Sequence, residues 1–132
     1  TPSLSSATLT GSLTAGGGTG TSGQFLQSTG TGVQWATTGG SSVVSKTANY
    51  TATTSDDVIL CSASGGAITI TLYAASGNSG KRLTVKKTDS TSNAVTIDAN
   101  AAETIDGSLT KSIASQYNSY TIVCDGSAWY VV

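Results

Sequence analysis

Carboxylates are the side chains of this sequence best suited to acid–base chemistry, because the chain contains no His. Two groups stand out by their spacing: the adjacent Asp56 and Asp57, and the set Asp98, Glu103 and Asp106. A glycosidase needs two carboxyl groups about 5 to 9 Å apart, flanking the bond that it cleaves. Each candidate, however, lies where a β-strand is expected to end, among residues that favour turns. We therefore expect these acids to stabilise turns, with a cation site or catalysis as the alternatives.

The absence of His removes further chemistry, because a Ser-His-Asp triad, a His-paired Cys nucleophile and an imidazole metal site all need that residue. The two cysteines, Cys61 and Cys124, lie among aliphatic residues of expected strands. Two thiols alone give a zinc ion too few ligands. We expect both to be buried, unpaired thiols, with a disulfide as the alternative. The sequence thus predicts no catalytic residue, no metal site and no cofactor.

The stretch GTGTSG at residues 18–23 has the spacing of the dinucleotide fingerprint G-x-G-x-x-G. That fingerprint requires a preceding strand, a following helix and an acid about 20 residues later. Here the flanking sequences are SLTAGG and QFLQSTGTG, and no acid occurs before Asp56. We expect this stretch to form turns of a fibrous segment instead of a cofactor site.

Four basic residues cluster at Lys81, Arg82, Lys86 and Lys87. We expect them to mark a solvated edge strand, and binding of an acidic glycan is the alternative. The chain has only six basic residues, a net charge of −1 and a pI near 4.9, so we expect no binding to nucleic acid. No apolar run approaches the roughly 20 residues of a membrane helix, so we expect no membrane insertion.

The elements that must position these groups differ between two parts of the chain. Residues 1–45 are all uncharged, and the six basic and seven acidic residues follow from Lys46 onward. The uncharged part is rich in Gly, Thr and Ser and alone could not bury enough surface to offset its chain entropy. It nevertheless contains anchors such as Leu26 and Trp35. We expect a fibrous segment, residues 1–44, that is ordered by oligomerisation, and a disordered tether is the alternative.

Residues 45–132 alternate short β-type runs with turn sequences about every ten residues, which is typical of a sandwich or barrel. The expected strands are 57–61, 67–73, 82–87, 94–98, a short piece at 104–105, 109–113, 119–124 and 128–132. Alternation within 67–73 (AITITLY) places Ile68, Ile70 and Leu72 on the core face. The sequence therefore predicts an all-β protein with an N-terminal intertwined fibrous β segment and a small antiparallel β-sandwich of jelly-roll type.

The last two expected strands allow a hairpin register to be predicted. A two-residue Asp-Gly loop at 125–126 pairs Ile122 with Trp129, which places the bulkiest side chains on one face. The opposite face carries Tyr130 and Val132 and is more apolar than a solvated surface requires. This face indicates contact with another subunit.

Residues 20–35, GTSGQFLQSTGTGVQW, resemble the G-x-S-G-Q-x-L-x-S-x-G-x-G-x-x-W element of tail-fibre and related receptor-binding proteins of tailed bacteriophages. Residues 50–132 are similar to the small β-rich modules that end such fibres, through the stretches 67–72, 86–89, 95–98, 103–107 and 125–132. The resemblance implies a homotrimer whose uncharged segment winds with its copies into a shaft or neck. It also implies a location in the virion tail fibre, assembly in the host cytoplasm and contact with other tail proteins.

The function that this resemblance implies is attachment of a trimeric fibre tip to a host cell-surface glycan or protein, without catalysis. A purely structural connector, decoration or trimerisation module is the alternative. If the N-terminal segment is the shaft, loops on the far side of the C-terminal domain face the host. Loops with hydroxyls, amides, an acid and a Tyr suit sugars, and they give these candidate binding residues: Asn78, Ser79, Lys81, Asp89, Asn93, Asn100, Glu103, Tyr117 and Asn118.

Overall fold

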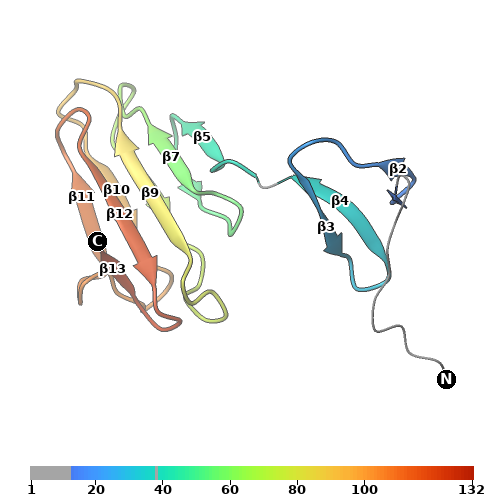
Figure 1. Cartoon of the computed structure of the whole chain (residues 1–132). Helices are drawn as coiled ribbons and strands as arrows, with labels where there is room; N and C mark the ends of the chain where they lie inside the picture. The colour runs from blue at the N-terminus through green and yellow to red at the C-terminus, as the bar shows by residue number, and fades with distance from the viewer. Residues whose placement is uncertain (1–12, 38) are drawn as a thin grey trace. The chain divides into compact units, whose positions relative to one another are not determined.

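The computed structural model describes residues 13–37 and 39–132, and within these ranges the chain contains strands and loops but no helix (Figure 1). The all-β prediction is therefore confirmed for the described residues. The strands are β1 (Thr14–Ala15), β2 (Gly18–Thr19), β3 (Gln24–Ser28), β4 (Val33–Thr37), β5 (Val43–Lys46), β6 (Tyr50–Thr51), β7 (Val58–Cys61), β8 (Ile68–Thr71), β9 (Arg82–Lys87), β10 (Val95–Asp98), β11 (Thr110–Ile113), β12 (Ser119–Cys124) and β13 (Trp129–Val131).

Two compact units make up the chain, and they divide between Gly40 and Ser41. The expected boundary between residues 44 and 45 lies inside β5, which pairs with β7 of the second unit. Residues 1–40 of the expected segment 1–44 belong to the first unit. Residues 1–12 and 38 of this unit lie outside the described residues.

The described part of the first unit contains two antiparallel hairpins, β1–β2 and β3–β4. Gly16 and Gly17 form the first turn with φ values of 62° and 85°, and a type I′ turn needs positive φ at both positions. Gly20 lies against the indole of Trp35, where an added Cβ would be 2.5 Å from Cδ2. The sequence predicted an intertwined fibrous segment, whereas the single chain forms local hairpins. Intertwining requires further chains and stays a prediction.

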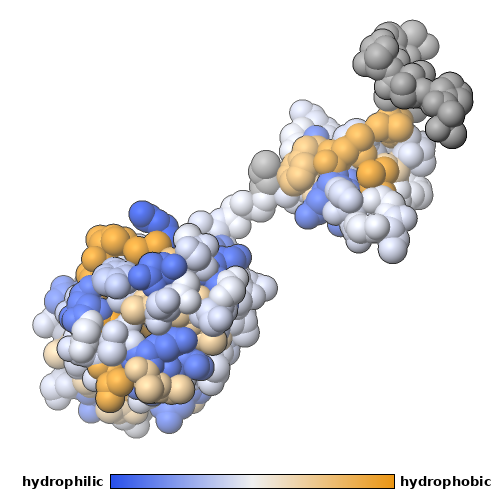
Figure 2. Space-filling view, turned by 90° about the horizontal axis from the view of Figure 1, so that it is seen from below, coloured by the Kyte–Doolittle hydropathy of each residue, from blue (hydrophilic) through white to orange (hydrophobic). Residues whose placement is uncertain are grey.

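Apolar side chains lie on both faces of the β3–β4 hairpin. Leu26 is paired with Trp35 on one face and Phe25 with Ala36 on the other, because neighbouring residues of a strand point to opposite sides. Phe25 is 44% exposed and Leu26 is 42% exposed. Figure 2 shows apolar side chains gathered on the surface of this unit. Each face of the hairpin thus carries an exposed apolar side chain.

The second unit contains a five-stranded sheet in the order β13-β12-β9-β7-β5 and a four-stranded sheet in the order β11-β10-β8-β6. Successive strands from β5 to β10 alternate between the two sheets, and each strand from β7 to β10 is parallel to the strand two places earlier in the chain. β11, β12 and β13 then add antiparallel pairs. The predicted antiparallel sandwich is therefore wrong for four strand pairs, because alternation within a strand indicates its buried face but not its partner or direction.

The core lies between the two sheets and is mostly aliphatic. Ile68, Ile70 and Leu72 are buried in it, as predicted, and Trp129 is fully buried with its ring 5.1 Å from that of Tyr73. The full core comprises Ala52, Ile59, Cys61, Ala63, Ile68, Ile70, Leu72, Ala75, Leu83, Val85, Val95, Ile97, Ala99, Ile105, Ile113, Ile122, Cys124 and Trp129. Both sheets contribute to this core, as the sandwich prediction requires.

The C-terminal hairpin differs from its predicted register by two residues. Ile122 pairs with Val131, and Cys124 pairs with Trp129, so the loop has four residues instead of two. The reason is Asp125, whose Oδ1 accepts hydrogen bonds from the amides of residues 127 and 128 at 2.7 and 2.8 Å. A shift of two leaves every side chain on its predicted face, so Ile122 and Trp129 are still buried.

The sandwich has two ends, which we name by the point where the chain comes into it. The proximal end holds Ser42, whose amide binds Asp57, together with loops 52–57, 72–81, 99–109 and 125–128. The distal end, at the top of the larger unit in Figure 1, holds loops 47–49, 62–67, 88–94 and 114–118. Short strands, most of them four to six residues long, separate these ends.

Candidate functional site

The nine candidate binding residues divide between the two ends of the sandwich. The proximal end carries Asn78, Ser79, Lys81, Asn100 and Glu103, and the distal end carries Asp89, Asn93, Tyr117 and Asn118. Strands of this length span about 13–20 Å. The nine residues therefore cannot form one site.

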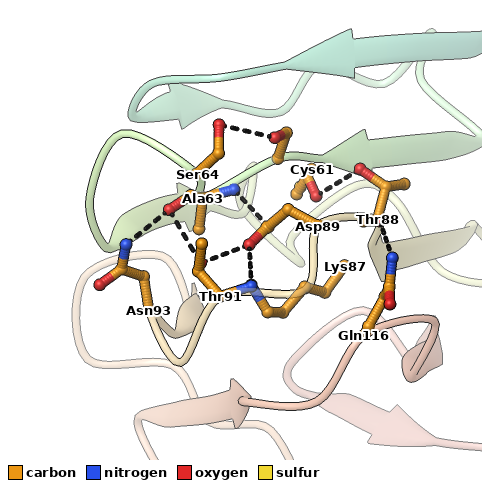
Figure 3. Close-up of polar contacts among 10 residues, drawn as sticks. Cys61, Ala63, Ser64, Lys87, Thr88, Asp89, Thr91, Asn93 and Gln116 are labelled. Atoms are coloured by element: carbon orange, nitrogen blue, oxygen red, sulfur yellow. Dashed lines mark hydrogen bonds and ion pairs between the residues drawn. The ribbon is translucent and has the colours of Figure 1, made fainter.

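A buried ion pair organises the distal end (Figure 3). The Lys87 side chain has no exposed surface, and its Nζ lies 2.6 Å from Oδ1 of Asp89. The other carboxylate oxygen accepts the amide of Ala63 at 2.6 Å, and Oδ1 also accepts the amide and hydroxyl of Thr91. Hydrogen bonds from Lys87 and then Thr91 hold the pKa of Asp89 far below its usual range. Asp89 thus ties the end of β9 to loops 62–67 and 88–94.

The remaining polar contacts in Figure 3 continue this bracing. Asn93 Nδ2 donates to the carbonyl of Ala63 at 2.8 Å, and the Thr88 hydroxyl donates to the carbonyl of Cys61 at 3.0 Å. Gln116 Nε2 donates to the carbonyl of Thr88 at 3.0 Å, so loop 114–118 is also joined to the start of loop 88–94. The amide of Asn93 and the carboxylate of Asp89 are therefore used within the chain.

The prediction that the basic cluster marks an edge strand is wrong. β9 lies between β12 and β7, so it is a central strand of its sheet. Lys87 is buried because it continues the alternation of the buried Leu83 and Val85. That alternation, followed by Asp89 two positions later, is a signal in the sequence from which the buried pair could have been found. Arg82 is exposed and Lys86 half-buried on the opposite face.

Candidates at the proximal end also bind the chain itself. Both carboxylate oxygens of Glu103 lie 3.0 Å from the amide of Ala75. Three side chains donate to carbonyl oxygens of neighbouring loops: Asn78 to Ala74, Lys81 to Thr54 and Asn100 to Leu72. Ser79 is exposed beside the turn at Gly126. This end is held together mainly by its own polar groups.

Four of the five acids that were considered for catalysis accept hydrogen bonds from backbone amides, and three of these amides belong to segments far away in the sequence. Asp57 accepts the amide of Ser42 at 2.7 Å, and Asp106 accepts that of Val131 at 3.1 Å. Asp98 instead lies on β10, in register with strand residues on either side. In residues 13–37 and 39–132, no group of three or more His, Cys, Asp or Glu side chains is placed to hold a metal ion.

Asp56 is nearly buried and accepts the Tyr50 hydroxyl at 3.0 Å and the Thr53 amide at 2.7 Å. Burial raises the pKa of Asp56, but the hydrogen bonds from Thr53 and Tyr50 outweigh it, so the net shift is downward. An acid held in its ionised form by its own loop is poorly suited to donate a proton. Asp56 is thus a structural carboxylate.

Cys61 and Cys124 are free and buried, which confirms the prediction. Burial raises the pKa of the Cys61 thiol to about 11. Because the thiolate is the reactive form, both groups behave as small apolar side chains of the core.

Tyr117 is the candidate that projects from the surface. The residue is 64% exposed. Its backbone has a φ of 64°, which is a conformation that favours Gly. Its amide donates to the carbonyl of Lys87 at 2.8 Å, and its carbonyl accepts Lys86 Nζ at 2.6 Å. No local pattern in the sequence indicates this neighbour, because only the pairing of β9 with β12 brings Lys86 beside loop 114–118.

No protein-family model matches the chain, and a search of curated proteins finds no match to it. Among the described residues, no helix is long and apolar enough to cross a membrane. The arrangement of side chains is thus the basis for a functional assignment.

Proposed function

We propose that this chain is the tip of a trimeric virion fibre that attaches to a glycan or protein of the bacterial surface without catalysis. The observation that carries the proposal is the distal end of the sandwich. Its loops are braced from inside by the Lys87–Asp89 pair, while Tyr117 projects outward from them. A rigid end with an exposed aromatic side chain is suited to binding, since little order is lost when a ligand binds.

Trimerisation is supported by the unsatisfied apolar surface of the first unit. A two-stranded hairpin is marginally stable alone, and β3–β4 exposes Phe25, Leu26 and Val33. Two further copies would cover both faces of the hairpin at once. A symmetric homo-oligomer is the usual solution for such a self-complementary surface.

The outer face of the five-stranded sheet offers a second surface for subunit contact. Val43 is 58% exposed, Val132 is 61% exposed and Tyr130 is 43% exposed, all on strands of this sheet or directly after one. Tyr130 and Val132 are residues for which the sequence predicts contact with another subunit, and the structure adds Val43 to the same face. Val43 lies on one edge strand of this sheet and Tyr130 on the other, so a subunit contact at either edge would leave Lys86 on the central strand β9 uncovered.

The path of the chain within the sandwich supports attachment through the distal end. The polypeptide comes into the sandwich at Ser42, at the proximal end, so the distal loops are the ones farthest from that point. Single sites of this polarity bind weakly, but several tips engaging together raise the effective affinity by orders of magnitude. Our proposal therefore needs no tight individual site.

The experiment that tests attachment uses fluorescently labelled full-length protein and a panel of bacterial strains. We expect the oligomer to adsorb to at least one strain and to lose adsorption when surface glycans are stripped enzymatically or genetically. Light scattering on the same sample is expected to give three times the 13.1 kDa chain mass. A 13.1 kDa species at micromolar concentration would contradict the trimer.

A structural connector is the second candidate, and one observation favours it. Most of the polar side chains once expected to meet a ligand are used for bracing, among them Asp89, Asn93 and Glu103. A stable trimer that adsorbs to no strain in the panel would support this function over attachment.

A further inference from the structure

Tyr117 occupies a place that neither packing nor backbone preference explains. Its ring is 64% exposed, so burial contributes little, and its φ of 64° is unfavourable for any residue with a side chain. Three hydrogen bonds nevertheless hold the backbone here. The Tyr117 amide donates to the Lys87 carbonyl, and the Lys87 amide donates to the Asn118 carbonyl. The third bond runs from Lys86 Nζ to the Tyr117 carbonyl. Strained residues that the surroundings hold in place cluster at binding sites.

A pocket of about 470 Å³ lies beside this ring and has the size of a small-ligand site. Its polar groups are hydroxyls and an amide, and buried Ile113 and half-buried Tyr120 supply apolar surface. The lining residues are Ser112, Ile113, Ala114, Ser115, Tyr117, Asn118, Ser119 and Tyr120. Hydroxyl and amide groups can hydrogen-bond the polar edge of a sugar, and an aromatic ring can stack on its apolar face.

The charge beside the Tyr117 ring is positive. Lys86 Nζ lies 5.7 Å from the centre of the Tyr117 ring, and no lining residue is an Asp or a Glu. An ammonium group has three donors, and one of them is directed to the Tyr117 carbonyl. The other two are available to a carboxylate of a ligand that lies on the ring.

We infer that Tyr117 and Lys86 bind an acidic sugar, a pyranose whose ring stacks on the tyrosine while its carboxylate meets the ammonium. This inference rests on the proposed attachment function and names the class of glycan that the distal end takes. The pocket hydroxyls and Asn118 then hydrogen-bond the ring substituents. The geometry assigns stacking to Tyr117, charge recognition to Lys86 and orientation to the pocket.

The test is an NMR titration of the full-length protein with short oligomers of galacturonic acid and, separately, with the matching galactose oligomers. We expect shifts of the Tyr117 and Lys86 signals with the acidic oligomers and binding at least tenfold weaker with the neutral ones. Tyr117→Gly should abolish the shifts at Asn118 and Lys86 without lowering the melting temperature, because Gly adopts a φ of 64° without strain.

Two variants serve as matched controls. Ala101→Gly makes the same backbone change at a proximal residue with a φ of 51°, so it should leave binding unchanged. Lys86→Gln should remove the preference for acidic over neutral oligomers, and Lys86→Arg should restore it. Equal binding of both oligomers by the wild type, or wild-type binding by Tyr117→Gly, would overturn the inference.

Failure of this inference is distinguishable from failure of the attachment proposal. Tyr117→Gly protein that adsorbs to cells like the wild type would refute the acidic-sugar site and leave attachment intact. Wild-type protein that binds the acidic oligomers through Tyr117 but adsorbs to no strain would refute attachment and support the site.

Discussion

The buried pair at the distal end predicts that its two partners respond unequally to mutation. Asp89→Ala would leave the Lys87 ammonium buried without a counter-charge, and its side chain has 0% exposure. Removing the partner of such a buried charge costs about 3–5 kcal/mol. The amides of Ala63 and Thr91 would lose their acceptor as well. We therefore expect Asp89→Ala to be among the most destabilising substitutions in this unit.

Lys87→Met should cost much less. The methionine keeps the buried stem, and Asp89 retains its bonds from Ala63 and Thr91. The loss of one charged hydrogen bond, about 1.5–3 kcal/mol, is offset because an ammonium group no longer has to be desolvated. The expected net cost is about 1 kcal/mol or less.

Thermal unfolding followed by circular dichroism measures the difference. One kcal/mol lowers the melting temperature of a domain of 60–100 residues by about 4–8 °C. Asp89→Ala should therefore lower it by about 12 °C or more, and Lys87→Met by less than about 8 °C. The double variant should be more stable than Asp89→Ala alone. Equal losses for the two single variants would refute this reasoning.

Three further predictions concern acid, the first unit and the thiols. The pKa of Asp89 in the folded protein lies below the ordinary 3.8, so the contribution of its carboxylate to stability is complete above about pH 5 and is lost as the pH falls below 3.8. The difference in unfolding free energy between wild type and Asp89→Ala, measured by urea unfolding, should therefore shrink below that pH. Gly20→Ala should displace the Trp35 indole and weaken the oligomer, seen by fluorescence and light scattering, because the new Cβ would lie 2.5 Å from the ring. Replacing Cys61 and Cys124 with Ala should cost about 1–2 kcal/mol each, with reversible folding, and thiol titration of the denatured, unreduced wild type should find two free thiols.

Local patterns in the sequence predicted local structure well. Alternation identified β8, β9, β10 and β12 within a residue or two and indicated their buried faces. The hairpin register was wrong by two, because the side chain of Asp125 binds two amides of the loop and lengthens it. Such a contact depends on loop geometry that residue types alone do not determine.

The features that local sequence patterns did not indicate depend on which strands pair over long distances in the sequence. The parallel order of β5, β7 and β9 arises because the chain crosses between sheets at each step. This order makes β9 central and buries Lys87, and it places Lys86 beside Tyr117. It also separates the nine candidate residues into two ends, of which Tyr117 and Asn118 remain exposed at the distal one. No local spacing carries that information.

The central claim is that the distal end of an oligomeric tip meets the cell surface, and selective blocking of either end tests it most directly. Cys61 and Cys124 are buried, so in the native protein only an introduced thiol should react. Ser115→Cys at the distal end and Ser76→Cys at the proximal end are both exposed positions for attaching a bulky polyethylene glycol. We predict that the modified Ser115→Cys protein loses adsorption to bacteria and the modified Ser76→Cys protein retains it. The reverse result, or adsorption unaffected by both modifications, would contradict the claim.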